Sequence, residues 1–200
     1  MFCKKSLLIA AASFCVVANQ SNAEEAHYVG LDLSLNQLDY KSNIASAQSF
    51  DDDAVGVGIR YGYRFDLASN MFITPELFFD YMGSSAKDSD SDPTEIDYKY
   101  GIKANLGYDI SDDWSGYVSF GVDQIDYSVK WNSVSREKSS HEFGFIWGVG
   151  ASKNLSDSTK LDLSFHRTNV DFDGPIASGL TPSDYEVDID VLKIGLSYKF

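Results

Sequence analysis

Hydrophobic and polar side chains alternate with a period of two in eight separate stretches of the sequence. In the clearest stretch the apolar positions are Ile96, Tyr98, Tyr100, Ile102, Ala104, Leu106 and Tyr108, and polar residues or glycines lie between them. Successive side chains of a β-strand point to opposite faces of a sheet, so this pattern predicts strands with one apolar face. The other stretches start near residues 29, 55, 71, 114, 142, 161 and 192. We therefore expect an all-β fold with eight strands.

The stretch that starts near residue 114 changes phase along its length. Its apolar positions are Val118, Phe120, Val122, Ile125, Tyr127 and Val129. One inserted residue would keep all of them on one face, and a β-bulge near Asp123 and Gln124 would provide it. We therefore expect Ile125 to share the outer face of Val122.

The segments between the stretches alternate in length. Those over 66–70, 111–113 and 154–159 are short and polar, whereas those over 37–53, 82–95, 130–140 and 171–184 are long. In an up-and-down meander all the long segments lie at one end. Short periplasmic turns and long extracellular loops are typical of outer-membrane barrels, so we predict an eight-stranded antiparallel transmembrane barrel.

The alternation alone leaves open which face meets solvent, because a soluble lipocalin-like barrel has its apolar face inside. Two features favour the membrane arrangement. The polar face mixes charges of both signs with many glycines, as a narrow filled interior requires. Aromatic residues also gather near both ends of the predicted strands, as in interfacial girdles: Tyr61, Tyr63, Phe65, Tyr108, Trp114, Tyr198 and Phe200 at one end, and Phe79, Tyr81, Tyr98, Tyr100 and Phe143 at the other.

The first residues have the pattern of a secretory signal peptide. Lys4 and Lys5 precede an apolar run over 7–17, and small residues follow at 21–23. We expect residues 1–23 to be removed and residues 24–200 to form one barrel domain. Both cysteines lie in the removed segment, so the mature domain is expected to lack disulfides.

The chain is strongly acidic. Its net charge is −14 at pH 7, and the predicted signal peptide contains two lysines and no acid, so the mature protein is more acidic still. This charge argues against a nucleic-acid partner, because phosphate neutralisation needs basic residues.

The final strand resembles the C-terminal signal that the barrel assembly machinery recognises in bacterial outer-membrane proteins. Its aromatic and apolar positions include Leu196, Tyr198 and the terminal Phe200. Together with the strand pattern, this ending resembles the small eight-stranded outer-membrane barrels of the OmpA/OmpX type. The resemblance implies a location in the bacterial outer membrane, with lipid, lipopolysaccharide and the assembly machinery as partners.

Charged residues on the polar faces predict ion pairs inside the barrel. Strand order brings Glu76 near Arg60 and Lys103, and closure of the last strand on the first brings Lys193 near Asp32. Because eight strands leave an interior just wide enough for side chains, we expect these pairs to plug the barrel. A gate or narrow ion path remains the alternative.

The segment 166–169 resembles the His-x-Ser-Asn pattern of lipid A deacylases, which are also eight-stranded barrels. Thr168 replaces the serine, and no acid is clearly placed to orient His166, so an interior histidine is the alternative. Arg167 lies on the outward parity, where it would meet lipopolysaccharide phosphates or extend to the membrane interface. The acidic run 88–92 lacks the calcium-loop pattern, and we expect no metal, cofactor or enzymatic activity.

These observations predict a membrane anchor whose acidic extracellular loops contact a partner outside the cell, in adhesion or envelope integrity. A narrow channel for ions or small solutes and a lipid-modifying enzyme are the alternatives.

Overall fold

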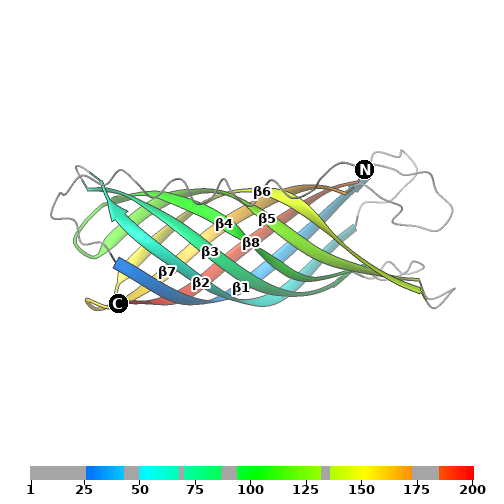
Figure 1. The fold of residues 1–200 in the computed structure, drawn as a ribbon, viewed down its shortest axis with the longest axis horizontal. Coiled ribbons are helices and arrows are strands. Elements are labelled where there is room, and N and C mark those ends of the chain that lie inside the picture. Colours follow the sequence, from blue (N-terminus) through cyan, green and yellow to red (C-terminus); the bar gives the residue numbers. More distant parts are fainter. Residues whose placement is uncertain (1–25, 43–49, 68–69, 87–93, 132–135, 173–184) are drawn as a thin grey trace, which may run out of the picture.

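The computed structural model describes residues 26–42, 50–67, 70–86, 94–131, 136–172 and 185–200. They form one closed antiparallel barrel of eight strands, each paired with the next in sequence and the last with the first (Figure 1). The strands are β1 (Ala26–Ser42), β2 (Phe50–Asp66), β3 (Met71–Ala86), β4 (Thr94–Asp109), β5 (Trp114–Trp131), β6 (Arg136–Asn154), β7 (Thr159–Phe172) and β8 (Tyr185–Lys199). The predicted all-β up-and-down barrel is confirmed.

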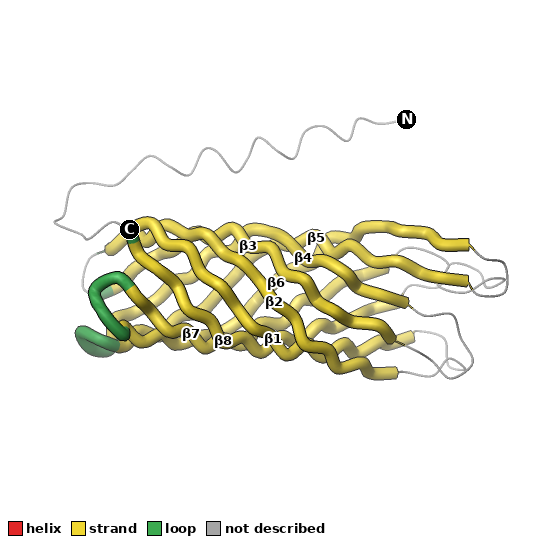
Figure 2. Tube along the Cα trace, turned by 90° about the horizontal axis from the view of Figure 1, so that it is seen from below, coloured by secondary structure: helices red, strands yellow, loops and turns green. Residues whose placement is uncertain are grey.

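The strands are longer than a membrane crossing requires. They contain from 14 residues in β7 to 19 in β6, whereas a tilted strand crosses the hydrocarbon core with about 9–11. All of them tilt in the same sense around the barrel axis (Figure 2). The described part of the chain contains no helix long and apolar enough to span a membrane.

The predicted loops were too long, because the strands continue into them. The chain between β1 and β2 spans 43–49, that between β3 and β4 spans 87–93, and that between β5 and β6 spans 132–135. The last of these is as short as the turn over 110–113 at the opposite end. We call the end with 110–113 and residue 200 the short-turn end, and the other the long-connection end.

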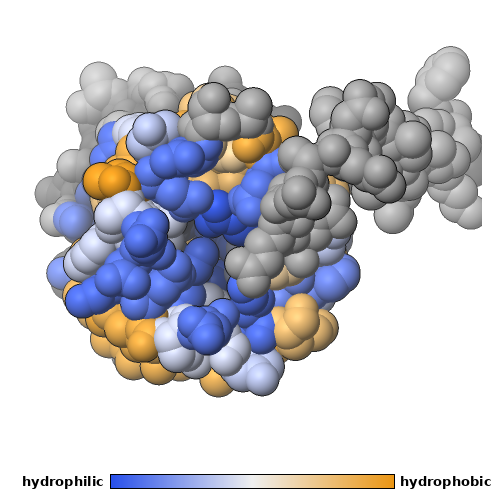
Figure 3. Space-filling model, turned by 90° about the vertical axis from the view of Figure 1, so that its left-hand side faces the viewer, coloured by the Kyte–Doolittle hydropathy of each residue, from blue (hydrophilic) through white to orange (hydrophobic). Residues whose placement is uncertain are grey.

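The outer wall of the barrel is apolar and its interior is polar over most of its length. Leu31 is 68% exposed, whereas the adjacent Asp32 is 4% exposed. Viewed from the short-turn end, hydrophilic residues occupy the middle of the barrel and hydrophobic residues lie at its margin (Figure 3). This is the arrangement expected where the outer wall meets lipid.

Near the long-connection end this arrangement is reversed. A buried cluster fills the interior there, which we call the apolar plug: Leu38, Met82, Ile96, Ile125, Val170, Val187, Ile189 and Val191. The outward positions at this end carry the polar collar: Gln37, Asp39, Asp53, Gln124, Asp126, Arg167, Asn169 and Asp190. The barrel thus has a membrane-type section with an apolar outer wall. Beyond it lies a section with a polar outer surface and an apolar interior, as in a water-soluble barrel.

The predicted bulge in β5 was wrong. Pairing of β5 with β6 runs without interruption through Asp123 and Gln124, and Ile125 is fully buried in the apolar plug. The change of phase in β5 therefore marks the reversal of polarity, with Ile125 turned inward rather than outward.

The irregular pairing lies instead in β3 and β4. Met82 and Gly83 of β3 stand opposite the single residue Asp97 of β4, and Asp97 is also unpaired on the β5 side. Gly83 has a φ of 62°, which a residue with a side chain rarely adopts. The bulge turns Ile96 inward, although the alternation alone predicted that it would share the outer face of Tyr98.

Candidate functional site

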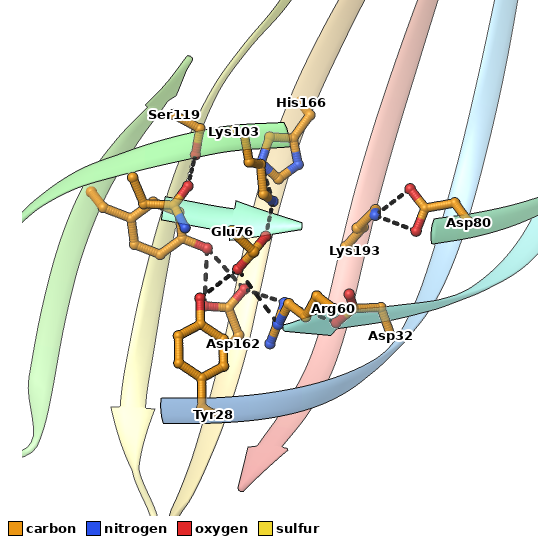
Figure 4. A network of polar contacts seen from close by, with 12 residues as sticks. Tyr28, Asp32, Arg60, Glu76, Asp80, Lys103, Ser119, Asp162, His166 and Lys193 are labelled. Carbon is orange, nitrogen blue, oxygen red and sulfur yellow. Dashed lines mark hydrogen bonds and ion pairs between the residues drawn. The ribbon is translucent and has the colours of Figure 1, made fainter. Parts of the chain in front are cut away.

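The most elaborate arrangement of polar side chains lies in the lumen, centred on Arg60 of β2. Its Nη1 atom is 2.8 Å from Asp32 Oδ1 and 3.3 Å from Asp162 Oδ1, and its Nε atom is 3.9 Å from Glu76 Oε2 (Figure 4). Arg60 therefore joins carboxylates from β1, β3 and β7. We call these four residues the lower cluster.

Glu76 links the lower cluster to β4. Its Oε1 atom is 2.8 Å from Nζ of Lys103, and Oε2 accepts a hydrogen bond of 2.6 Å from the Tyr28 hydroxyl. Tyr117 similarly donates to Asp162 at 2.8 Å. The structure thus brings together the predicted trio of Arg60, Glu76 and Lys103.

The predicted pairing of Lys193 with Asp32 was wrong. Lys193 Nζ lies 2.7 and 2.6 Å from the two carboxylate oxygens of Asp80 on β3, while Asp32 is bound to Arg60. In the register of β1 and β8, Asp32 lies opposite Gly195, and Lys193 lies two residues away, opposite Ser34. The lysine side chain is long enough to cross the lumen to Asp80 instead. Side-chain reach, rather than strand neighbourhood, determines this pair.

A further group of contacts surrounds Lys99. Its Nζ atom is 2.8 Å from Thr168 Oγ1 and 3.2 Å from Asp123 Oδ2, and Thr168 donates to the same Asp123 oxygen at 3.0 Å. We define the upper cluster as Lys99, Lys103, Lys193, Asp80 and Asp123, since Lys99, Lys193 and the two aspartates lie nearer the long-connection end than the lower cluster.

His166 and Thr168 do not form a nucleophile and base pair. Both side chains are buried in the lumen, and no hydrogen bond joins them within the described residues. Thr168 is engaged with Lys99 and Asp123, while His166 Nε2 lies 3.3 Å from Lys103 Nζ. Because an ammonium group only donates, this contact requires Nε2 to be the acceptor.

Small and aromatic residues make room for the charges and shield them. A Cβ atom on Gly195 would overlap the Asp32 carboxylate, and one on Gly144 would lie 2.5 Å from Asp123 Oδ1. The ring of Phe78 lies between two lysines, with its centroid 5.8 Å from Lys103 Nζ and 5.4 Å from Lys193 Nζ. Glycine at these two positions thus leaves room for the neighbouring carboxylates.

The terminal residue is fixed at the seam where β8 closes on β1. Phe200 N donates to the carbonyl of His27 at 3.0 Å, and the two rings stack with centroids 5.9 Å apart. His27 also contacts the ring of Tyr63 and accepts or donates a 2.6 Å hydrogen bond at Tyr61. Of the predicted assembly-signal residues, Leu196 and Tyr198 lie on the outer wall of β8 and are exposed.

Arg167 lies on the outer surface at the border between apolar wall and polar collar. Its Nε atom donates to Asp190 Oδ1 at 2.6 Å and its Nη2 atom to Asp190 Oδ2 at 2.5 Å. The guanidinium is therefore neutralised by the protein itself, and the buried Asp188, two residues earlier on β8, accepts a hydrogen bond from Asn169.

Sequence reasoning missed several lumen residues: Tyr28, Asp80, Lys99, Tyr117, Asp123 and Asp162. For most of these residues the alternation predicts an inward side chain, as for Lys99 between Tyr98 and Tyr100. Their partners were not predicted, because most of these contacts cross the lumen between strands that are not neighbours, as Lys193 of β8 and Asp80 of β3 do. Among the described residues no group of His, Cys, Asp and Glu is arranged to hold a metal ion.

Solved structures with the same fold are known outer-membrane proteins. Neisserial surface protein A is 16% identical, with a TM-score of 0.60 and coverage of 87% of this chain and 97% of that one. Ail, the attachment invasion locus protein of Yersinia pestis, is 15% identical, with a TM-score of 0.54 and coverage of 87% of this chain and 99% of that one. OprG of Pseudomonas aeruginosa is 16% identical, with a TM-score of 0.52 and coverage of 88% of this chain and 95% of that one. At these identities the likeness shows the fold alone.

Comparison with models of sequence families assigns the chain to a family. A search of curated proteins found no match. The model of the outer membrane protein beta-barrel domain, however, matches residues 7–200. The chain therefore belongs to this family and is a protein of the bacterial outer membrane.

Proposed function

We propose that the protein is a closed membrane anchor that presents its extracellular end to a partner outside the cell, in adhesion or envelope integrity. The observation that carries this proposal is the pairing of charges in the lumen. Each of the five inward carboxylates of the two clusters lies within 4 Å of a cationic group. The apolar plug lies above them.

Energetics favour a closed lumen over an open pore. Removing one partner from a buried ion pair costs about 3–5 kcal/mol, because the other charge is left uncompensated. An ion path through the lumen would separate several such pairs and would also have to hydrate the apolar plug. We therefore expect no conductance from the wild-type protein in planar bilayers. Stable channels whose conductance changes in an Arg60→Gln variant would support the channel instead.

The charge of the polar collar indicates the kind of partner. Its acids are Asp39, Asp53, Asp126 and Asp190, and Arg167 is its single cation within the described side chains. Ail has been crystallised in complex with the heparin analogue sucrose octasulfate, which is a polyanion. An acidic collar repels polyanions, so we propose a neutral or cationic partner for this chain.

Contacts with the envelope complete the proposal. The apolar wall meets membrane lipid, and the final strand is read by the assembly machinery. Because Arg167 is already bound to Asp190, we expect lipopolysaccharide phosphates to approach the collar through divalent cations rather than through Arg167 alone.

The partner's charge can be tested with the protein in lipid nanodiscs. We expect retention on a surface of cationic peptide, weakened in high salt, and no retention on heparin. The double variant Asp53→Asn with Asp126→Asn should bind the cationic surface less, whereas Asp112→Asn at the short-turn end should not change binding. Retention on heparin would contradict the proposed partner class.

A separate experiment tests the surface role itself. Replacing 43–49 and 173–184 by short turns should abolish attachment of cells that display the protein, while the barrel still migrates as a folded species before boiling. Undiminished attachment would refute this role. An enzymatic role is not part of the proposal, and a change of lipid A mass that depends on His166 would contradict it.

A further inference from the structure

Strand β6 separates from its neighbour β7 near the long-connection end. The ladder between them ends at the pair of Gly144 and Val170, although β6 extends to Arg136 and β7 to Phe172. Beyond that pair β6 remains paired with β5, and β7 remains paired with β8. In Figure 1 the hairpin of β5 and β6 accordingly ends apart from β7 and β8. Within the described part of the chain, β6 therefore has a free edge over 136–143, which we call the β6 edge.

The β6 edge begins where the outer surface of the barrel becomes polar. Phe143 and His141 of β6 are exposed, and they lie opposite Gln124 and Asp126 of the polar collar. Lipid cannot satisfy the hydrogen bonds of an unpaired strand edge, whereas water can. The opening therefore lies in the section of the barrel that meets water, and the β6 edge is accessible from there.

A free edge can pair with one more strand. Every second residue of a strand directs its N–H and C=O groups to the same side, so the β6 edge offers an alternating row of donors and acceptors. It is about 26 Å long, at a rise of about 3.3 Å per residue. It contains no proline or glycine, residues that interrupt many natural edges. Extended peptides bind to such edges as an added strand.

The order of charges along the β6 edge selects the strand that fits it. The edge reads Arg136, Glu137, Lys138, Ser139, Ser140, His141, Glu142 and Phe143. Opposite charges directly across a strand pair stabilise the pair, and like charges destabilise it. An antiparallel partner strand therefore needs acids opposite 136 and 138, bases opposite 137 and 142, and an apolar residue opposite 143. Such a strand is neutral overall, which lies within the neutral or cationic class proposed above.

A second copy of the chain in the same membrane does not fit the β6 edge. Two identical edges pair antiparallel only about a two-fold axis perpendicular to the strands. Copies in one membrane are instead related by rotation about the membrane normal. Because the strands of such barrels tilt by about 35–45°, a two-fold rotation about the normal makes them cross at about 70–90°. This geometry favours a segment of a different protein.

We propose that the β6 edge binds an extended segment of the extracellular partner as an added antiparallel strand. Backbone hydrogen bonds to the β6 edge supply affinity, and the order of charges supplies specificity. This binding mode rests on the proposed function, since it specifies how the partner of the polar collar is held.

A synthetic peptide tests strand addition directly. The probe Val-Lys-Thr-Thr-Thr-Glu-Lys-Glu, with both ends blocked, places an opposite charge across from each charged residue of the β6 edge. The control Val-Glu-Thr-Thr-Thr-Lys-Glu-Lys has the same composition and net charge but places like charges there. On the protein in lipid nanodiscs the probe should bind about tenfold or more tighter than the control, because four charge pairs change sign. No binding, or equal binding of the two peptides, would overturn the proposal.

Amide exchange identifies the groups that point to the free side. Without peptide, every second amide of 136–143 should exchange fast, and the probe should protect these amides. Slow exchange of all of them without peptide would show that another part of the chain covers the edge, and would overturn the proposal.

A proline at one of two neighbouring serines separates the β6 edge from the hairpin. The N–H groups of Ser139 and Ser140 point to opposite sides of β6, so only one of them faces the free side. Proline at the serine whose amide exchanges fast should weaken probe binding about tenfold or more and leave the unfolding temperature of the barrel unchanged. Undiminished probe binding would overturn strand addition.

The cell-attachment experiment distinguishes this binding mode from the surface role itself. Attachment that persists undiminished in the same proline variant would overturn strand addition and leave the surface role intact. Peptide binding is measured without cells, so it decides strand addition even where the surface role fails.

Discussion

Glu76 shows how one buried carboxylate holds several strands together. It contacts Lys103 on β4, Arg60 on β2 and Tyr28 on β1, and its own side chain comes from β3. Such a residue stabilises the barrel only while all its partners remain, because each partner is buried and depends on it for compensation.

Replacing Glu76 by glutamine should therefore destabilise the barrel strongly. The amide keeps the shape of the side chain but leaves the charges of Lys103 and Arg60 partly uncompensated, so the free energy of unfolding should fall by about 3–5 kcal/mol. Denaturant unfolding in lipid vesicles, followed by tryptophan fluorescence, measures this loss. Asp112→Asn, in an exposed turn, should change stability by less than about 0.5 kcal/mol. A loss for Glu76→Gln as small as the control would contradict the network.

Two glycines of different surroundings form a second test. A Cβ atom on Gly195 would overlap Asp32 and lie 3.1 Å from Arg60 Nη2, whereas the nearest atom to a Cβ on Gly116 is 3.6 Å away. Gly195→Ala should cost about 1–3 kcal/mol through overpacking, and Gly116→Ala should be nearly neutral. The same unfolding experiment measures both, and equal effects would show that the lumen is looser than described.

On the scale of the strands, sequence predicted the fold far better than the strand ends. The alternation of apolar and polar residues predicted all eight strands. Within the membrane, outward side chains meet lipid and inward ones form ion pairs, so each strand must alternate. Beyond the membrane the outer positions become polar and the inner ones apolar, so Gln37 and Leu38 read as loop rather than strand. In β5 the same reversal resembled a bulge, because periodicity cannot distinguish an inserted residue from an exchange of faces.

The reversal locates the membrane surface on each strand. On β1 the outward residue Leu35 belongs to the apolar wall and the next outward residue, Gln37, to the polar collar. Spin labels on single cysteines should show that Leu33→Cys and Leu35→Cys are accessible to oxygen dissolved in lipid. Gln37→Cys and Asp39→Cys should be accessible to a water-soluble nickel complex. Accessibility of Gln37→Cys to lipid oxygen alone would place the polar collar inside the membrane and contradict the two-section barrel.

The whole molecule depends on closing β8 against β1, and we propose two separable roles there for Phe200. Phe200 packs on His27 in the folded barrel, and the resemblance of the last strand predicts a second role for it as an assembly signal. The sequence predicts the signal from the alternation of Leu196, Tyr198 and Phe200. It could not supply the contact with His27, because the two residues meet only after closure.

Phe200→Ala and His27→Ala distinguish these roles, because either change removes the stacked rings but only the first changes the C-terminal signal. In purified protein refolded in lipid vesicles, His27→Ala should lower the free energy of unfolding at least as much as Phe200→Ala, because His27 also contacts Tyr61 and Tyr63. In cells, Phe200→Ala should reduce the amount of heat-modifiable barrel in the outer membrane several-fold, whereas His27→Ala should remain near wild type. Equal losses in cells would mean that Phe200 acts by packing alone, since an intact signal would then give His27→Ala no advantage during assembly.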